Sequence, residues 1–224
     1  MKAFVYTSYG LPEKVLQLKE IQKPVPKENE VVIKVVATAV NDYDWALITG
    51  RPWLYRLMFG LFKPKFPIPG MELSGIVEHM GSEVTGFEVG DDVFGDISEH
   101  GFGAFAEYVC VNQKAVIKKP KGIDHIHAVA LPHAGLLALQ ALETVRLQEG
   151  LKILINGAGG GVGTLAVQLC KMKICEVTGV DTGEKLNEMK KIGFDHVLDY
   201  KKEDFIKNGI QYDLILDCKT NRPA

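Results

Sequence analysis

The sequence predicts an α/β protein in two parts: a small β-barrel-type domain, then a partial, doubly wound parallel sheet. Three observations lead to this prediction. Short alternating apolar runs, separated by glycines and acidic turns, fill the chain up to Pro120. After Pro120 helical patterns begin, and from Leu151 strands and helices alternate. A strand, a glycine-rich turn and a helix follow one another directly in residues 151–171.

The first domain, expected over residues 1–122, consists mainly of short strands. Residues 2–7 and 16–21 are expected to pair, and residues 23–27 form a turn. In the run 30–38 alternation would place Val31, Ile33 and Val35 on one face. Further strands are expected at residues 73–79, 93–95, 105–111 and 115–118.

The second domain, expected over residues 123–224, opens with helices at 124–129 and 134–146. Strands are then expected at residues 152–156, 176–180, 196–198 and 212–217. The helices between them are expected at residues 161–172, 183–192 and 203–208. Such alternation indicates a parallel sheet with right-handed crossovers. A complete doubly wound sheet has about six strands, so we expect this one to lack its second half.

The glycine-rich turn indicates a dinucleotide site. In the register Ala158-x-Gly160-x-x-Gly163, Ala158 takes the tight-turn position and Gly160 lets phosphates approach the backbone. Gly163 lets the helix pack close to the strand, and Gly159, Gly161 and Val162 complete the segment. A strand, a tight turn and a helix N-terminus in this order present backbone N–H groups to a pyrophosphate. Asp181 ends the next strand, near the spacing expected for an acid that binds the ribose.

Bulk composition excludes several classes of protein. The net charge is −2 with no basic block, so we expect no nucleic acid partner. The four cysteines show no C-x-x-C spacing, which favours free buried thiols in a reducing compartment, and hence a cytoplasmic protein. The N-terminus enters a strand pattern and lacks the apolar core of a signal peptide. The most apolar window, 126–145, contains histidine, proline and glutamate and is interpreted as a buried loop and helix.

Several stretches along the whole chain, in order, resemble one family: residues 1–6, 39–44, 70–77, 89–94, 103–109, 131–140 and 156–163. They are similar to the medium-chain dehydrogenase/reductase superfamily, in its zinc-independent, ζ-crystallin-like quinone oxidoreductase branch. The resemblance implies a GroES-like catalytic domain followed by a partial Rossmann domain. It also implies an NAD(P)H-dependent oxidoreductase that transfers hydride to quinones or α,β-unsaturated carbonyls.

The resemblance also assigns roles in the catalytic domain. Asn41 and Asp44 would line the nicotinamide cleft, Asn41 as a hydrogen-bond donor and Asp44 as a positioning acceptor. Tyr43 could donate a proton or belong to the core, and both readings stay open. His133 would shape the nicotinamide pocket.

The cofactor's adenosine end gives two opposing indications. Asp181 favours a free ribose diol and therefore NAD. Thr182, Lys185 and Tyr200 match positions that hold the 2′-phosphate and the adenine in NADPH-using relatives. Lys185 is either the cation that a phosphate needs or a solvated residue in the first turn of the next helix. NAD and NADP both stay open, with the balance toward NADP.

We expect no metal. Zinc-dependent members of the superfamily hold catalytic zinc with cysteine, histidine and a second cysteine, and these positions are Asn41, Met71 and His133 here. Asn41 and Met71 are poor zinc ligands. Without a Lewis acid, alcohol oxidation loses its alkoxide stabiliser, whereas reduction of a polarised quinone or enone remains accessible. A zinc-independent alcohol dehydrogenase is one alternative function.

Full-length members of the family are longer, and residues 217–224 resemble a family sequence that stops mid-fold. The sequence leaves open a cloned fragment, a frameshifted gene or a natural short form. A catalytically incompetent binding or regulatory protein is therefore a second alternative, and a homodimer is expected. Residues 51–65 mix aromatic and basic side chains, which predicts either a helix covering the active-site mouth or a peripheral membrane contact.

Overall fold

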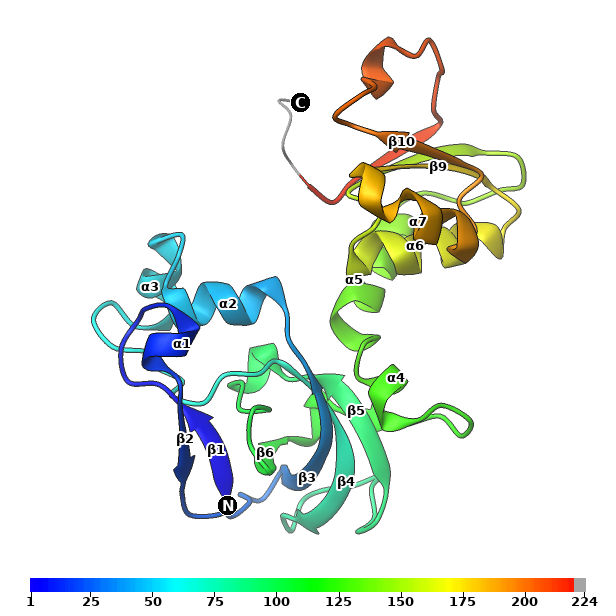
Figure 1. Ribbon diagram of the computed structural model, residues 1–224. Coiled ribbons are helices and arrows are strands. Elements are labelled where there is room, and N and C mark those ends of the chain that lie inside the picture. The colour runs from blue at the N-terminus through cyan, green and yellow to red at the C-terminus, as the bar shows by residue number, and fades with distance from the viewer. Residues whose placement is uncertain (220–224) are drawn as a thin grey trace. The chain divides into compact units, whose positions relative to one another are not determined.

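The computed structural model describes residues 1–219, so the last part of the predicted mid-fold ending, residues 220–224, lies outside the described residues. The chain forms two compact units, Met1–His133 and Ala134–Ala224 (Figure 1). The division falls later than the boundary expected after residue 122, because His125 and His133 bond to strands of the first unit. The predicted architecture, an antiparallel sheet domain and a partial parallel sheet, is confirmed.

The first unit contains a five-stranded antiparallel sheet in the order β6-β3-β4-β5-β7. Its strands are β3 (Glu30–Ala39), β4 (Glu72–Met80), β5 (Asp92–Asp96), β6 (Tyr108–Asn112) and β7 (Ile117–Lys118). Separately, β1 (Lys2–Val5) pairs with β2 (Gln17–Glu20), as predicted. Val31, Ile33 and Val35 pack into one apolar cluster, which confirms their shared face.

Three helices of this unit lie outside the strands that alternation predicts: α1 (Pro12–Val15), α2 (Asp42–Thr49) and α3 (Leu54–Phe59). Short 3₁₀ turns occur at Ser98–His100 and Gln113–Ala115, so the strand expected over 115–118 is reduced to β7. The strand expected from residue 105 begins at Tyr108. The start of α2 could have been predicted from the sequence, because Asn41 and Asp44 have the spacing of a capping box. In the structure the Asp44 carboxylate accepts the backbone N–H of Asn41.

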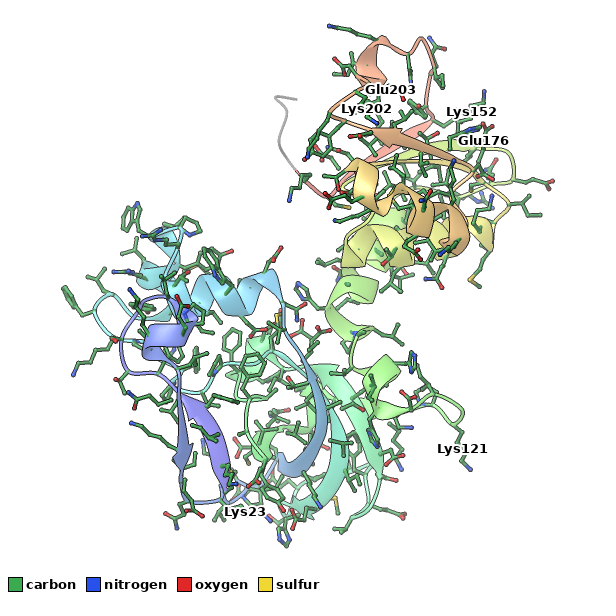
Figure 2. The ribbon with its side chains drawn as sticks, viewed as in Figure 1. Lys23, Lys121, Lys152, Glu176, Lys202 and Glu203 are labelled. Atoms are coloured by element: carbon green, nitrogen blue, oxygen red, sulfur yellow. The ribbon has the colours of Figure 1, made fainter. Side chains whose placement is uncertain are left out.

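The second unit is a four-stranded parallel sheet in the order β10-β9-β8-β11. Its strands are β8 (Lys152–Asn156), β9 (Glu176–Asp181), β10 (His196–Asp199) and β11 (Leu214–Asp217). Lys152 and Glu176, labelled in Figure 2, are partners in the register of β8 with β9. This is the 3-2-1-4 portion of a doubly wound sheet.

Helices α4 (His125–Ala128), α5 (Pro132–Glu143), α6 (Gly161–Lys171) and α7 (Leu186–Ile192) follow the predicted ones, with a 3₁₀ turn at Gly183–Lys185 before α7. The prediction of a helix over 203–208 is wrong. Only a 3₁₀ turn, Phe205–Lys207, forms there, and none of its residues is buried, so tertiary packing does not support a longer helix. The core of the unit gathers Ile153, Ile155, Val167, Met189 and Phe194 between sheet and helices.

The four cysteines are free thiols. Cys170 and Cys175 are buried as predicted, whereas Cys110 is half-buried and Cys218 is exposed, so the expectation of burial is wrong for these two. Strand β6 leaves Cys110 at the rim of its sheet, where the Sγ contacts Glu30. In the part of the chain that the structure describes, no helix has the length and apolar character needed to cross a bilayer.

Candidate active site

The glycine-rich turn lies where the sequence places it, between the end of β8 and the start of α6. The N–H groups of Gly157 and Ala158 donate to the Val180 carbonyl at 2.9 and 3.1 Å. The positive φ of the turn, 80°, belongs to Gly157 rather than to Ala158, which corrects the predicted tight-turn position. Ala158 can occupy its position because only its neighbour needs the left-handed conformation.

Gly163 has the packing role that the sequence predicts. A Cβ built on this residue would lie 2.5 Å from the Ala158 carbonyl oxygen and 2.6 Å from the Ala158 Cα. Both atoms belong to the backbone of the turn and cannot move without shifting β8 away from α6. The absence of a side chain at Gly163 therefore allows the short distance between α6 and β8.

Asp181 braces the same turn from the end of β9. One carboxylate oxygen accepts the Gly159 N–H at 2.9 Å, and the other accepts the Thr182 N–H at 2.8 Å. The Lys185 ammonium lies 3.3 Å from this carboxylate. Burial alone would raise the pKa of Asp181, but the two N–H groups and Lys185 together lower it. An ionised carboxylate thus fixes the loop between β8 and α6.

The four residues expected at the adenosine end lie at the carboxyl ends of β9 and β10. Thr182 and Lys185 follow Asp181 in the chain, and the backbone N–H of Tyr200 donates to the Asp181 carbonyl at 3.2 Å. The Tyr200 side chain is partly exposed. An acid, a threonine, a lysine and a tyrosine therefore meet through their backbone and ionic contacts at the carboxyl end of β9.

These residues fit a dinucleotide. Gly160, the N-cap of α6, has no side chain to satisfy the first N–H groups of the helix. A Cβ on Gly159 would lie 2.5 Å from the Lys185 Cδ, so there is no room for a side chain between the loop and Lys185. Such a helix N-terminus at the carboxyl end of a parallel strand suits a diphosphate.

A second group of polar side chains lies at one end of the β4–β5 pair in the first unit. Glu72 and Asp96 are direct partners in the antiparallel register, so their side chains share one face. The buried Glu72 carboxylate accepts the Asn41 Nδ2–H at 2.6 Å and the His133 backbone N–H at 2.7 Å. Sequence reasoning missed Glu72 and Asp96, although each is a carboxylate at the end of an apolar strand.

His133 and Asp96 form a hydrogen-bonded pair, with 2.8 Å between Nδ1 and Oδ2. The other Asp96 oxygen accepts the Ser98 N–H at 2.9 Å. Burial would raise the pKa of Asp96, but the bonds from His133 and Ser98 lower it. The same bond to Asp96 raises the pKa of His133 against the effect of burial. Because an ionised carboxylate only accepts, Nδ1–H of His133 is the donor and Nε2 is the remaining nitrogen.

Asp44 does not line a cleft, which corrects the predicted placement. Its side chain is completely buried, and its two oxygens accept the backbone N–H groups of Asn41 and Gly70, each at 3.0 Å. Burial raises the pKa of Asp44 to about 6, although these two N–H groups act in the opposite direction. The residue is a positioning acceptor that ties the start of α2 to the residue before β4.

The substitution Asp44→Asn should remove a pH dependence of stability. The carboxyl is protonated in both states below about pH 4, and the folded state must bury its charge as the pH rises to about 6. This costs the native chain roughly 3 kcal/mol at neutral pH relative to acid. Urea unfolding between pH 4 and 7 should therefore show a smaller decrease in the variant than in the wild type. The exposed Asp42→Asn is the control and should follow the wild type; equal slopes for all three proteins would contradict this account.

A pocket of about 460 Å³ lies within the first unit beside these groups. Its lining includes Tyr43, Met58, Phe59, Lys65, Phe66, Met71, Ser98, Glu99 and His133. Tyr43 also belongs to an aromatic cluster, with its ring 5.5 Å from Tyr55 and 6.0 Å from Phe59. Tyr43 therefore packs in the aromatic cluster and also lines the pocket, and its role as a donor stays a prediction.

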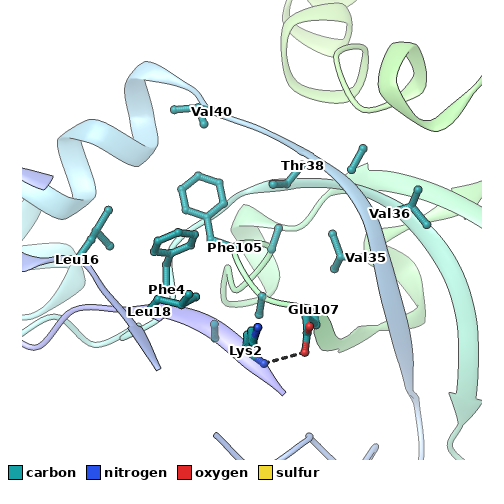
Figure 3. Close-up of a pocket in the computed structure, with 14 residues that line it drawn as sticks. Lys2, Phe4, Leu16, Leu18, Val35, Val36, Thr38, Val40, Phe105 and Glu107 are labelled. Carbon is teal, nitrogen blue, oxygen red and sulfur yellow. Dashed lines mark hydrogen bonds between the residues drawn. The ribbon is translucent and has the colours of Figure 1, made fainter. Parts of the chain in front are cut away.

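A larger groove of about 550 Å³ runs between β1, β2 and β3. Figure 3 shows Phe4, Leu18, Val36 and Phe105 on its walls, with one hydrogen bond of 2.8 Å from the Lys2 N–H to the Glu107 carboxylate. Its walls are almost entirely apolar. It offers no titratable pair comparable to His133 and Asp96, so the smaller pocket is the better candidate for chemistry.

The three positions expected to hold zinc in other members have other partners. The Asn41 amide donates to Glu72, and the His133 ring bonds to Asp96. Met71 is completely buried in an apolar cluster with Leu47 and Phe102. Among the described residues, no three His, Cys, Asp or Glu side chains are grouped as a metal site.

Comparison with known proteins adds independent findings. Residues 27–121 match the alcohol dehydrogenase GroES-like domain, and residues 161–223 match the zinc-binding dehydrogenase family. The chain is 37% identical to the chloroplast envelope quinone oxidoreductase homolog of Arabidopsis thaliana, over all of this chain and 69% of that protein. It is 35% identical to the 2-methylene-furan-3-one reductase of Solanum lycopersicum, over 97% of this chain and 56% of that protein.

Solved structures of quinone oxidoreductases also resemble this chain. The quinone oxidoreductase from Coxiella burnetii superposes with a TM-score of 0.86 at 32% identity, over 97% of this chain and 68% of that one. The Escherichia coli quinone oxidoreductase complexed with NADPH gives a TM-score of 0.79 at 27% identity, over 91% of this chain and 60% of that one. The chain belongs to the medium-chain dehydrogenase/reductase superfamily, in its quinone oxidoreductase branch.

Proposed function

We propose that this chain is an NAD(P)H-dependent oxidoreductase that reduces quinones or α,β-unsaturated carbonyls without zinc. The observation that carries the proposal is the bond of Asp96 with His133, which lines the pocket, together with the hydrogen-bonded Asn41 and the buried Met71 at the other two zinc-ligand positions. The names of the relatives, which include a quinone oxidoreductase homolog and an NADPH-dependent alkenal/one oxidoreductase, support the same class of substrate.

A nicotinamide dinucleotide, when bound, supplies a hydride, and the reduced product also needs one proton. The first N–H groups of α6, those of Gly161, Val162 and Gly163, would hold the diphosphate, while the bonds of Gly159 to Asp181 and of Gly160 to Gly157 fix the loop beside it. Asn41, fixed by Glu72, would donate a hydrogen bond to the carbonyl oxygen or to a ribose. Protonated His133 would donate the proton from Nε2 and recover it from water, while Asp96 stabilises its charge. Tyr43 lines the same pocket, but burial raises its pKa, which makes it the weaker acid.

Turnover with defined substrates tests this proposal. The purified chain should oxidise NADPH or NADH with a benzoquinone or a 2-alkenal, and a chelator should not reduce the rate. Alcohol oxidation with NADP⁺ or NAD⁺ should be negligible. Binding of NADPH without turnover would favour a non-catalytic binding protein, and alcohol oxidation that survives the chelator would favour an alcohol dehydrogenase. Either result would overturn the proposed reaction.

Lys185→Ala should reveal the cofactor preference. The ammonium lies beside Asp181 at the proposed 2′-phosphate position, and a lysine–phosphate contact is a strong, charge-assisted interaction. We expect the Kd for NADPH to rise about tenfold, equivalent to about 1.4 kcal/mol, with a smaller change for NADH. Lys191→Ala removes the same charge from the exposed face of α7 and is the control. Equal losses for both cofactors would contradict a role at the 2′-phosphate.

A further inference from the structure

The segment between Asp44 and Glu72 combines exposed apolar side chains with uniformly positive charge. Residues 45–71 contain four basic residues and no Asp or Glu, in a chain whose net charge is −2. Arg51, Lys63 and Lys65 are exposed, whereas Arg56 bonds to the Gly50 carbonyl and covers the Tyr9 ring. The segment therefore carries four positive charges and no negative side chain of its own, in a protein with a net negative charge.

The apolar members of this segment are unusually open to solvent. Phe62 is 86% exposed, Trp53 65% and Met58 64%. Trp45, Leu54, Leu57 and Leu61 are also exposed. A short segment with so many exposed apolar side chains is typical of an interaction site. We call these seven residues, with Arg51, Lys63 and Lys65, the α3 patch.

The opposite side of α3 anchors the patch firmly. Tyr55 and Phe59, one helical turn apart, stack on each other and pack against Tyr43. Phe59 also packs edge-on against Phe102, with ring centroids 5.9 Å apart. Helix α3, which follows α2 in Figure 1, thus buries one side in the aromatic cluster and presents the other outward.

We propose that the α3 patch docks the protein on an anionic lipid surface. Tryptophan, phenylalanine and leucine side chains enter the headgroup boundary, while neighbouring lysines and arginine stay at the phosphates. The absence of acidic residues from 45–71 makes the segment complementary to a negative surface, and each basic residue near such a surface contributes about fivefold in affinity.

The proposed function gives this docking a purpose, and that purpose, unlike the docking itself, rests on the proposed function. Met58 belongs to the α3 patch and also lines the pocket that contains His133. Quinones and enones with apolar chains concentrate in lipid. A substrate could therefore pass from the bilayer surface to the pocket along α3.

The chain carries its own reporter for this test, since its two tryptophans, Trp45 and Trp53, both lie in the patch. With vesicles of phosphatidylcholine containing about a third phosphatidylserine, tryptophan emission should shift to shorter wavelength and be quenched by brominated acyl chains. Pure phosphatidylcholine vesicles should bind at least tenfold more weakly, and 0.5 M salt should weaken binding to the anionic vesicles.

Two variants and a matched control decide the outcome. Lys63→Glu with Lys65→Glu should weaken binding to anionic vesicles at least tenfold, and Phe62→Ser should reduce the blue shift. Lys201→Glu with Lys202→Glu makes the same charge change on exposed lysines of the second unit, where Figure 2 labels Lys202, and should bind like the wild type. Circular dichroism verifies that all variants fold.

Three results would overturn the proposal. One is a wild type that does not bind anionic vesicles, and another is an equal loss in the Lys201/Lys202 control. The third is a wild-type dimer in sedimentation that Phe62→Ser converts to a monomer without any vesicle binding, because the patch would then be an interface between two copies. None of these readouts depends on turnover, so this proposal and the proposed reaction can fail separately.

Discussion

Gly163→Ala is expected to abolish NADPH binding and to destabilise the second unit. The added Cβ would lie 2.5 Å from the Ala158 carbonyl oxygen, so α6 must move away from β8. Overpacking of this kind costs roughly 1–3 kcal/mol, and the movement also displaces the N–H groups proposed to hold the diphosphate. Thermal unfolding and calorimetric titration with NADPH measure the two effects.

Two glycine variants separate stability from binding. Gly135→Ala lies in helix α5, where its Cβ would meet only the Leu165 Cδ1 at 3.6 Å, and should leave both measurements close to wild type. Gly160→Ala meets only the Gly157 carbonyl oxygen at 3.3 Å, so the fold should survive while the methyl group keeps phosphate from the backbone. Wild-type NADPH affinity in Gly163→Ala and Gly160→Ala would refute the assigned site.

His133→Gln is expected to reduce kcat/KM by a factor of about 10² or more, the usual contribution of a general acid. Asp96 raises the pKa of His133, so the acid form persists to higher pH and the rate should fall as the pH rises through that pKa. In Asp96→Asn this fall should move to lower pH, because the carboxylate that stabilises the imidazolium is gone. The pH profile of kcat/KM with a 2-alkenal measures both effects.

An exposed histidine of the first unit provides the matched control. His127 bonds to Asp124 at 2.8 Å in an exposed pair, so His127→Gln makes the same change outside the pocket. It should leave the rate and its pH profile unchanged. An unaltered profile in Asp96→Asn would show that the pair is structural and that water supplies the proton.

Periodicity and turn chemistry were sufficient for the parallel sheet and for the glycine turn. The apolar run at Ile153–Ile155, the glycines after it and the acid at Asp181 are local signals, and each lies where local rules place it. Gly163 is the clearest example: its place in the glycine-rich pattern predicts close packing of helix on strand, and the structure leaves no room for a Cβ there.

The polar group around His133 could be predicted only in part. Asn41 and His133 were identified, but Glu72 and Asp96 hold them in place because β4 and β5 pair in one particular antiparallel register. Register over such distance in the chain is not encoded by any local pattern. Asp44 was misplaced for a related reason, since its burial depends on the Gly70 N–H, which comes from a distant segment.

We expect the turn between β8 and α6 to hold the diphosphate of a nicotinamide dinucleotide. Titration of ¹⁵N-labelled protein with NADPH, followed by amide chemical shifts, tests it most directly. The largest chemical-shift changes are predicted at Gly159, Gly160, Gly161, Val162 and Gly163. These changes should reach a plateau at the NADPH concentration that saturates binding. Saturable binding that leaves these five amides unmoved, or no binding by the intact chain, would contradict the account.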